Sequence, residues 1–158
     1  MRSSKIKSVE VNFRKKAFEI KTKKGIFPFP FCFLALKPSK NDPIQKVYVD
    51  PEIENRGFTY VLTSGKEDTV LMDQILFVNK DPDYMRNHIL YELTLEALKL
   101  LEVSGLSKRE ISRRLKTSPA QVYRLLDTTN YKKSTDEMLR LISSIGYEVD
   151  FEIKKKVA

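Results

Sequence analysis

Three serines, each followed three positions later by Glu or Gln, constrain the second half of this 158-residue chain more than any other feature. They open the segments Ser107-Lys-Arg-Glu110, Ser118-Pro-Ala-Gln121 and Ser134-Thr-Asp-Glu137. In such a capping box the serine oxygen accepts from the third backbone N–H of a helix, and the Glu or Gln side chain accepts from the serine N–H. The sequence therefore predicts three helices that begin at these serines.

The first two of these helices are separated by a very short connection. The first must end near Leu115, and the second begins at Ser118. A pair joined so tightly cannot pack antiparallel, so the helices must cross steeply, as in a helix-turn-helix unit. The apolar spacing agrees, because it turns Ile111, Leu115, Val122 and Leu125 inward and places the small Ser112 where the helices come closest.

The segment LSKREISRRLKTSPAQVYRLL, residues 106–126, resembles the Cro/repressor-type (XRE) helix-turn-helix of bacterial regulators. Residues 134–153 resemble the tail of HigA-like antitoxins, in which a helix is followed by a strand, and the whole resemblance covers residues 90–153. Lys116 stands where the family often has Gly, and Ser112 where it often has Ala. A lysine at the positive φ of this turn costs about 1 kcal/mol, which a folded domain tolerates.

The resemblance implies that the second helix enters the major groove of DNA while the first lies across the backbone. The positions that would then face base edges are Pro119, Ala120 and Arg124. Arg124 is the strongest candidate for direct readout, because a guanidinium can pair with O6 and N7 of guanine. The positions that match phosphate contacts in the family are Ser107, Lys108, Ser118, Gln121, Tyr123, Asn130, Lys132 and Lys133. Arg113 and Arg114 would add attraction at longer range.

The positive charge of the chain is concentrated in the same region. The net charge is +8, and residues 105–133 hold eight basic side chains against Glu110 and Asp127 alone. A cationic surface of this kind is typical of proteins that bind phosphate groups, although a solvated charged face accounts equally well for charge alone.

The first half of the chain has the composition of β-strands. Residues 6–13 and 17–22 flank the basic stretch Arg14-Lys15-Lys16 and predict a hairpin, and residues 58–63 and 69–71 flank a polar turn and predict a second one. From Asp81 the apolar residues recur at helical spacing up to Gly105. The expected organisation is a β-rich domain over residues 1–80, a bridging helix over 81–104 and a helix-turn-helix domain over 105–158.

The fold class expected from these patterns is α+β. An antiparallel β-rich half precedes an all-helical helix-turn-helix domain, which ends in a short C-terminal strand. That last strand is predicted because Tyr147, Val149, Phe151 and Ile153 alternate with acidic residues.

Two further segments of the first half allow more than one interpretation. Phe27, Phe29, Phe31 and Phe33 alternate with other residues, so an extended segment would present four rings on one face, as core, as a dimer seam or as a docking groove. Residues 1–24 hold nine cations against two acids, which predicts a charge-protected sheet edge or a wider nucleic-acid footprint.

Several classes of site are poorly supported by the composition. The chain has one cysteine, Cys32, and one histidine, His88, so a metal site, a disulfide and most catalytic triads are not expected. We expect no enzyme and no cofactor. The longest apolar run, Ile26–Leu36, is too short to span a membrane, and no secretory signal is recognised, so a cytoplasmic protein without membrane contact is expected.

These observations favour a sequence-specific regulator that binds double-stranded DNA as a homodimer and represses its own gene. The alternative is an antitoxin-like module that neutralises a cognate toxin protein and represses the shared operon. Binding of RNA or single-stranded nucleic acid through the β-rich half ranks third, because its aromatic residues do not interleave with its charges.

Overall fold

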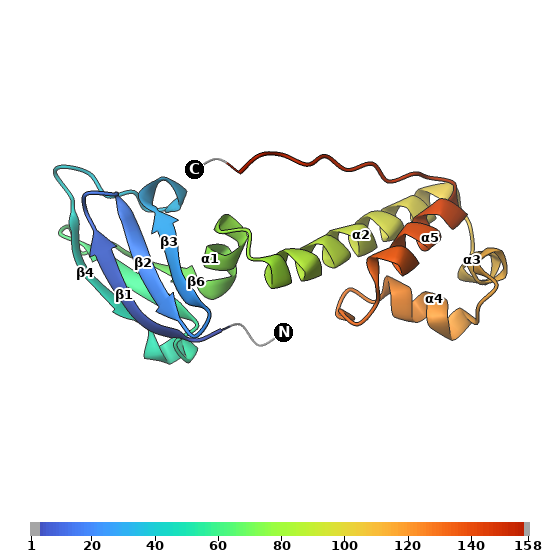
Figure 1. Cartoon of the computed structure of the whole chain (residues 1–158), viewed down its shortest axis with the longest axis horizontal. Coiled ribbons are helices and arrows are strands. Elements are labelled where there is room, and N and C mark those ends of the chain that lie inside the picture. The colour runs from blue at the N-terminus through green and yellow to red at the C-terminus, as the bar shows by residue number, and fades with distance from the viewer. Residues whose placement is uncertain (1–3, 157–158) are drawn as a thin grey trace. The chain divides into compact units, whose positions relative to one another are not determined.

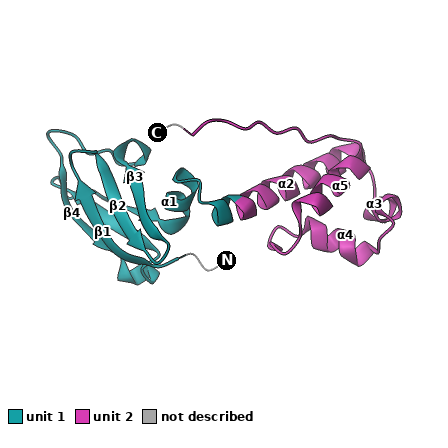
Figure 2. Ribbon diagram, in the orientation of Figure 1, with its two compact units in different colours: residues 1–85 teal, residues 86–158 magenta. Residues whose placement is uncertain are grey.

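The computed structural model describes residues 4–156, so Arg2 and the outer ends of the first and last predicted domains lie outside the described residues. The chain divides into two compact units, residues 1–85 and 86–158 (Figure 2). Strands occupy the first unit, whereas helices make up the second.

The first unit contains two antiparallel three-stranded sheets (Figure 1). One sheet consists of β1 (Ile6–Asn12), β2 (Ala17–Thr22) and β3 (Gly25–Pro30), and the other of β4 (Ile44–Val49), β5 (Gly57–Leu62) and β6 (Glu67–Leu71). Two short 3-10 helices, η1 (Phe31–Phe33) and η2 (Pro51–Ile53), and the helix α1 (Met72–Val78) complete it. Both predicted hairpins are confirmed, because β1 pairs with β2 and β5 pairs with β6.

Aromatic side chains from both sheets form the centre of this unit. The ring of Phe18 lies 4.7 Å from that of Phe58 and 5.5 Å from that of Tyr60, measured between centroids, and all three are fully buried. Rings at these separations contribute both buried apolar area and favourable edge contacts. The aromatic cluster therefore joins the two sheets in one core.

The stripe of four phenylalanines does not form one extended face. Phe27 and Phe29 belong to β3, but the chain leaves the strand at Pro30 and turns into η1, which holds Phe31 and Phe33. Pro28 lies within β3, because this strand is at the edge of its sheet and tolerates a missing N–H, whereas the chain turns into η1 after Pro30. Phe29 is buried and Phe31 lies against Phe18, whereas Phe33 is exposed, so most of the stripe belongs to the core.

The helices of the second half are α2 (Pro82–Ser104), α3 (Lys108–Leu115), α4 (Pro119–Leu126) and α5 (Thr135–Ile145). The carboxylate of Asp81 accepts from Tyr84 N (3.1 Å) at the start of α2, and Gly105 follows its end with φ of 67°. Residues that are almost fully buried bind the four helices together: Leu90, Ala97, Ile111, Val122, Met138, Leu141 and Ile142.

The fold class predicted from the sequence is wrong in two respects. Residues 147–156 form neither strand nor helix, and Phe151 and Ile153 are 84% and 90% exposed. Alternation selects the faces of a strand, but a strand also needs a neighbour to pair with, and none of the described strands pairs with this segment. The helical part is also not clearly separate, because α1 lies in the β-rich unit and α2 starts there and continues into the second.

Candidate nucleic-acid interface

The connection between α3 and α4 consists of three residues, Lys116, Thr117 and Ser118. Lys116 adopts the left-handed conformation (φ 53°). The resemblance predicts this, because Lys116 stands where the family often has glycine. Buried Ser112 donates its hydroxyl to Thr117 O, and Thr117 N donates to Ser112 O (3.1 Å), so the turn is closed from both sides. This turn makes α3 and α4 cross steeply (Figure 1).

The predicted inward residues hold the two helices against α5. Ile111, Val122 and Leu125 are buried and Leu115 is half-buried, which confirms the apolar register. Because these residues face the core, the opposite side of α4 stays open. Pro119, Ala120, Gln121 and Tyr123 are all exposed there.

The three predicted N-terminal serines all cap their helices. Ser107, Ser118 and Ser134 each accept from the third backbone N–H, at 3.1, 3.3 and 3.1 Å. The reciprocal bond of a full capping box forms at Ser134 alone among them, where Glu137 accepts from the serine N–H at 2.8 Å. Glu110 and Gln121 instead accept from nearby arginines, which offer stronger donors.

Arg124, the strongest predicted base contact, is held within the helical unit. Its Nε donates to Gln121 Oε1 (2.7 Å), and one terminal nitrogen forms an ion pair with Glu137 of α5. The side chain is 36% exposed. A guanidinium has five N–H donors, so three remain for a ligand once these two bonds are made. The partners fix the plane of the guanidinium at the side of α4.

Arg113 and Arg114 both donate to the carboxylate of Glu110. Arg113 does so through two nitrogens at 2.9 and 2.6 Å, and Arg114 through Nε at 3.0 Å. These bonds lower the pKa of Glu110 to about 2, the Arg113 bonds contributing most. Arg114 also donates to Ser144 O (2.8 Å) near the end of α5. Glu110 thus cancels part of the predicted positive field, and Arg114 ties α3 to α5.

Lys133 lies inside the helical unit rather than on its surface. It is 1% exposed, and its Nζ donates to Thr94 Oγ1 (2.6 Å), Leu125 O (2.8 Å) and Asp127 O (2.9 Å). Burial lowers the pKa of this ammonium group. Its three protons are all used in these bonds, so in this structure Lys133 has no donor left for a phosphate.

Asn130 also serves the loop that follows α4. Its Nδ2 donates to Arg124 O (3.1 Å), and its Oδ1 accepts from Lys132 N (3.0 Å). The side chain thus stabilises the last turn of α4, and one amide proton remains for an outside acceptor.

The remaining predicted phosphate contacts lie at the surface. Ser107 and Ser118 sit at exposed helix N-termini, and Lys132 is exposed. The Nζ of Lys108 lies 4.3 Å above the ring of Tyr123, which brings the start of α3 next to the exposed side of α4. These side chains leave their charge or hydroxyl accessible.

Two cations that the sequence reasoning did not assign belong with this group. Arg109 and Lys116 are exposed and form no ion pair with any carboxylate of residues 4–156. Lys132 shares both properties, and Lys108, which is half-buried, also forms no ion pair with a described carboxylate. Arg109 lies in the first turn after an N-cap, and Lys116 lies in the turn between α3 and α4. These two positions in the sequence could have indicated that both side chains are exposed. We refer to Lys108, Arg109, Lys116 and Lys132 as the unpaired cations.

In the described part of the chain no three His, Cys, Asp or Glu side chains gather as metal ligands. Nor does any helix among those residues combine the length and apolarity that crossing a membrane requires.

No protein family, no curated protein and no solved structure matches this chain.

Two carboxylates, Glu110 within α3 and Glu137 between α5 and α4, make stability depend on acid pH. The Ser134 N–H first, and then Arg124, hold the pKa of Glu137 below its usual 4.5, and Glu110 titrates near 2. Because folding depresses these pKa values, their contribution is complete well above pH 4.5 and is lost as the pH falls toward about 2. We expect the urea midpoint of the helical unit to be constant from about pH 7 to 5.5 and then to decrease.

Glu137→Gln separates charge from capping in this experiment. Glutamine can still accept from Ser134 N–H, so the variant loses chiefly the ion pair with Arg124. Glu137 is 38% exposed, so solvent screening limits the expected cost to about 0.5–1 kcal/mol at pH 7. Its urea midpoint should change less with acid than that of the wild type. An equal acid slope in both proteins would contradict the role of Glu137.

Proposed function

We propose that this chain is a transcription regulator that binds specific sites on double-stranded DNA through α3 and α4. The observation that carries the proposal is the tight α3–α4 turn, closed by Ser112 and Lys116, which leaves the outer side of α4 uncovered with Lys108 next to it. A helix presented in this way fits the major groove, whose width admits one α-helix.

Base recognition would come from the first turns of α4. Pro119 and Ala120 can contact only apolar groups such as a thymine methyl. Arg124 can still direct a pair of N–H groups at guanine, because Gln121 and Glu137 occupy only two of its five donors. Direct readout would therefore be sparse and would depend on how Glu137 orients Arg124.

Phosphate binding would come from both helix N-termini and the unpaired cations. Ser107, Ser118, Gln121 and Tyr123 supply hydroxyl or amide donors, and Asn130 supplies one amide proton. Lys108, already beside Tyr123, would contact the backbone at the start of α3. Such contacts position the protein without reading sequence.

A homodimer that represses its own gene in the cytoplasm is the form of action we propose. Two recognition helices would then meet half-sites about one helical turn apart, which gives a palindromic operator. No described feature favours a toxin partner over this role, so neutralisation of a toxin is not part of the proposal.

Arg124→Ala and Lys108→Ala distinguish base readout from phosphate contact. We expect Arg124→Ala to weaken a cognate site about 5- to 50-fold while random DNA loses much less. Lys108→Ala should weaken both DNAs alike and reduce the salt dependence by about one ion. Fluorescence anisotropy over a series of salt concentrations measures both quantities.

Lys99→Ala is the matched control for charge. Lys99 lies on α2 and is paired with Glu96 (2.7 Å), so its loss should change neither affinity nor salt dependence appreciably. Urea unfolding of Arg124→Ala must accompany the titration, because this variant also loses the pair with Glu137. Equal losses on cognate and random DNA for Arg124→Ala would refute its role in readout.

A further inference from the structure

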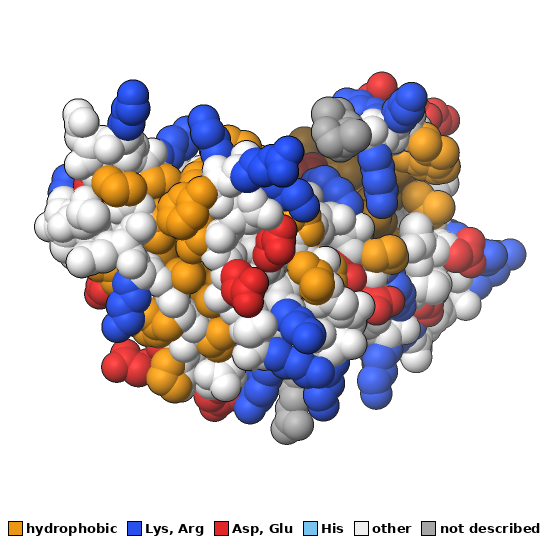
Figure 3. Space-filling model, turned by 60° about the vertical axis from the view of Figure 1, so that its left-hand side comes forward, with side chains coloured by type: hydrophobic (Ala, Val, Ile, Leu, Met, Phe, Trp, Pro, Cys, Tyr) orange, Lys and Arg blue, Asp and Glu red, His pale blue; other side chains and the backbone are white. Residues whose placement is uncertain are grey.

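A cavity of about 630 Å³ opens in the β-rich unit, and none of its lining residues is among the predicted DNA contacts. It lies between the β1–β2 turn, which carries Phe13 and Lys16, and the loop of residues 37–43, which carries Lys40. Figure 3 shows hydrophobic side chains exposed on the near face of the molecule, with Lys and Arg around them. Small-molecule sites in proteins typically have volumes in this range.

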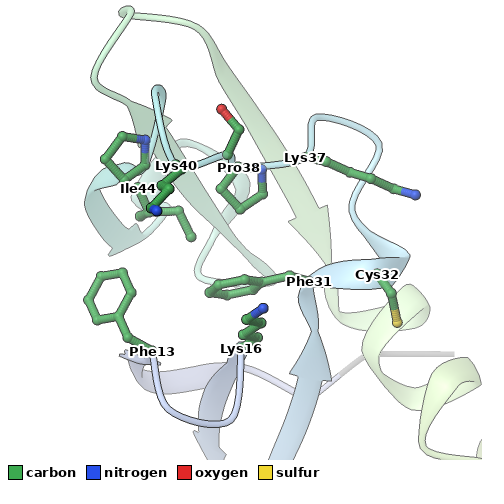
Figure 4. A pocket seen from close by; sticks show the side chains of 10 residues that line it. Phe13, Lys16, Phe31, Cys32, Lys37, Pro38, Lys40 and Ile44 are labelled. Carbon is green, nitrogen blue, oxygen red and sulfur yellow. The ribbon is translucent and has the colours of Figure 1, made fainter.

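The walls of the cavity are apolar and its rim is cationic. Phe13, Phe31 and Ile44 supply much of the apolar lining, together with two prolines of the loop. Phe13 is 62% exposed, although most phenylalanines of the unit are buried or half-buried. In Figure 4 the rings of Phe13 and Phe31 lie near Lys16 and opposite Ile44 and Lys40, whereas Lys37 extends away from them.

The loop that forms one wall is held at both ends and in its middle. The buried Tyr60 donates its hydroxyl to Leu36 O (2.7 Å), and Thr63 N donates to Pro43 O (3.0 Å). Between them, Ser39 and Asp42 exchange two backbone hydrogen bonds at 3.1 and 3.2 Å. A loop fixed in this way pre-forms the cavity, so binding would cost little ordering entropy.

The charges around the cavity favour an anion. Lys16, Lys37 and Lys40 line it, no acidic residue does, and none of the three forms an ion pair with a described carboxylate. The nearest carboxylate in the loop, Asp42, is bound instead to Thr63 Oγ1 (3.0 Å), Ser64 N (2.8 Å) and Ser64 Oγ (2.7 Å). Lys15, the neighbour of Lys16, is paired with Glu19 (3.5 Å).

We propose that this cavity binds a small amphipathic anion, with an aromatic or short aliphatic body between Phe13, Phe31 and Ile44 and a carboxylate between Lys16 and Lys40. The apolar body would cover exposed ring surface, and the carboxylate would accept from two ammonium groups that have no acidic partner. The proposal does not depend on the function of the helices, and its test uses no DNA.

The probe is 2-naphthoate, with the isosteric but uncharged 2-naphthamide as its control. Both are titrated into the full chain by calorimetry, and amide chemical shifts locate the site. We expect 2-naphthoate to bind with a Kd below about 1 mM, to shift residues of the β1–β2 turn and of the loop 37–43, and to bind at least about fivefold tighter than the amide.

Three variants assign the site to named side chains. Lys16→Glu and Lys40→Glu should each weaken 2-naphthoate at least about fivefold, and Phe13→Ser by a similar factor, because Phe13 is too exposed to be required for folding. Lys23→Glu makes the same change of charge in the exposed β2–β3 turn, at the other end of β2, and should leave affinity within about twofold.

Three results would overturn the proposal. They are no binding at about 2 mM 2-naphthoate, equal affinity for acid and amide, or equal losses in Lys16→Glu and Lys23→Glu. Absence of binding would turn attention to an acidic segment of a partner protein as the occupant.

Discussion

Lys133→Ala should destabilise the helical unit by about 3 kcal/mol, a larger loss than we expect from any other single lysine of the chain. The Nζ of Lys133 is the donor that satisfies Leu125 O and Asp127 O, two carbonyls at the end of α4 where no further helical N–H is present. It also binds Thr94 of α2. Its removal leaves the buried Leu125 O and Thr94 Oγ1 without this donor and opens a cavity.

Lys133→Met separates the two causes of this loss. Methionine retains most of the side-chain volume but has no donor, and it avoids the cost of burying a charge. We therefore expect a smaller destabilisation for Lys133→Met than for Lys133→Ala, about 1–2 kcal/mol. Urea unfolding followed by amide signals of residues 86–156 measures both, with residues 4–85 as the reference.

Lys132→Ala is the matched control in the same loop. Lys132 is exposed and its side chain has no ion pair with a described residue, so its removal should change stability by less than about 0.5 kcal/mol. If Lys133→Ala and Lys132→Ala were equally stable, the buried ammonium could not be what joins α4 to α2.

Ala120→Glu should abolish specific DNA binding without loss of stability. Ala120 is exposed in the first turn of α4, where an acidic side chain interacts favourably with the helix dipole. On DNA the same carboxylate would meet phosphates and the electronegative edge of the groove. We expect a loss of at least about 30-fold in cognate affinity, together with an unchanged or higher urea midpoint.

Val103→Glu controls for the added negative charge. Val103 is exposed on α2, outside the α3–α4 unit, so its replacement should reduce DNA affinity by no more than about twofold. Similar losses in Ala120→Glu and Val103→Glu would mean that net charge, rather than the surface of α4, determines binding.

Local signals predicted the helix-turn-helix elements well. Ser107, Ser118 and Ser134 each accept from a backbone N–H three positions later, within one helical turn. Both partners of each bond can therefore be recognised in a short stretch of sequence. The left-handed conformation of Lys116 follows in the same way from a three-residue turn between two caps.

Partners distant in the sequence account for what the sequence did not reveal at the candidate interface. Lys133 is one of two adjacent lysines, and only the position of Thr94, 39 residues earlier, shows which of them is buried. Arg124 likewise pairs with Glu137, which follows it by 13 positions in the sequence. Thr94 is the one polar residue among the buried positions of α2, and it could have indicated that a polar group from another element is buried against this helix.

The C-terminal strand failed for a related reason. Alternation of Tyr147, Val149, Phe151 and Ile153 with acids describes how a strand would divide its faces, but pairing depends on an available edge. The alternation from Phe27 to Phe33 likewise did not show where the strand ends, because β3 includes Pro28 and the chain turns into η1 only after Pro30.

Recovery of DNA from a genomic library tests the central proposal most directly. The full chain and its Ala120→Glu variant are incubated with fragmented genomic DNA at about 0.15 M salt with excess competitor, and the bound fragments are sequenced. The account predicts that the wild type enriches one or a few palindromic sites with half-sites about one helical turn apart, and that the variant enriches none. Uniform recovery by both proteins, disappearing as the salt concentration rises, would contradict sequence-specific binding by α4.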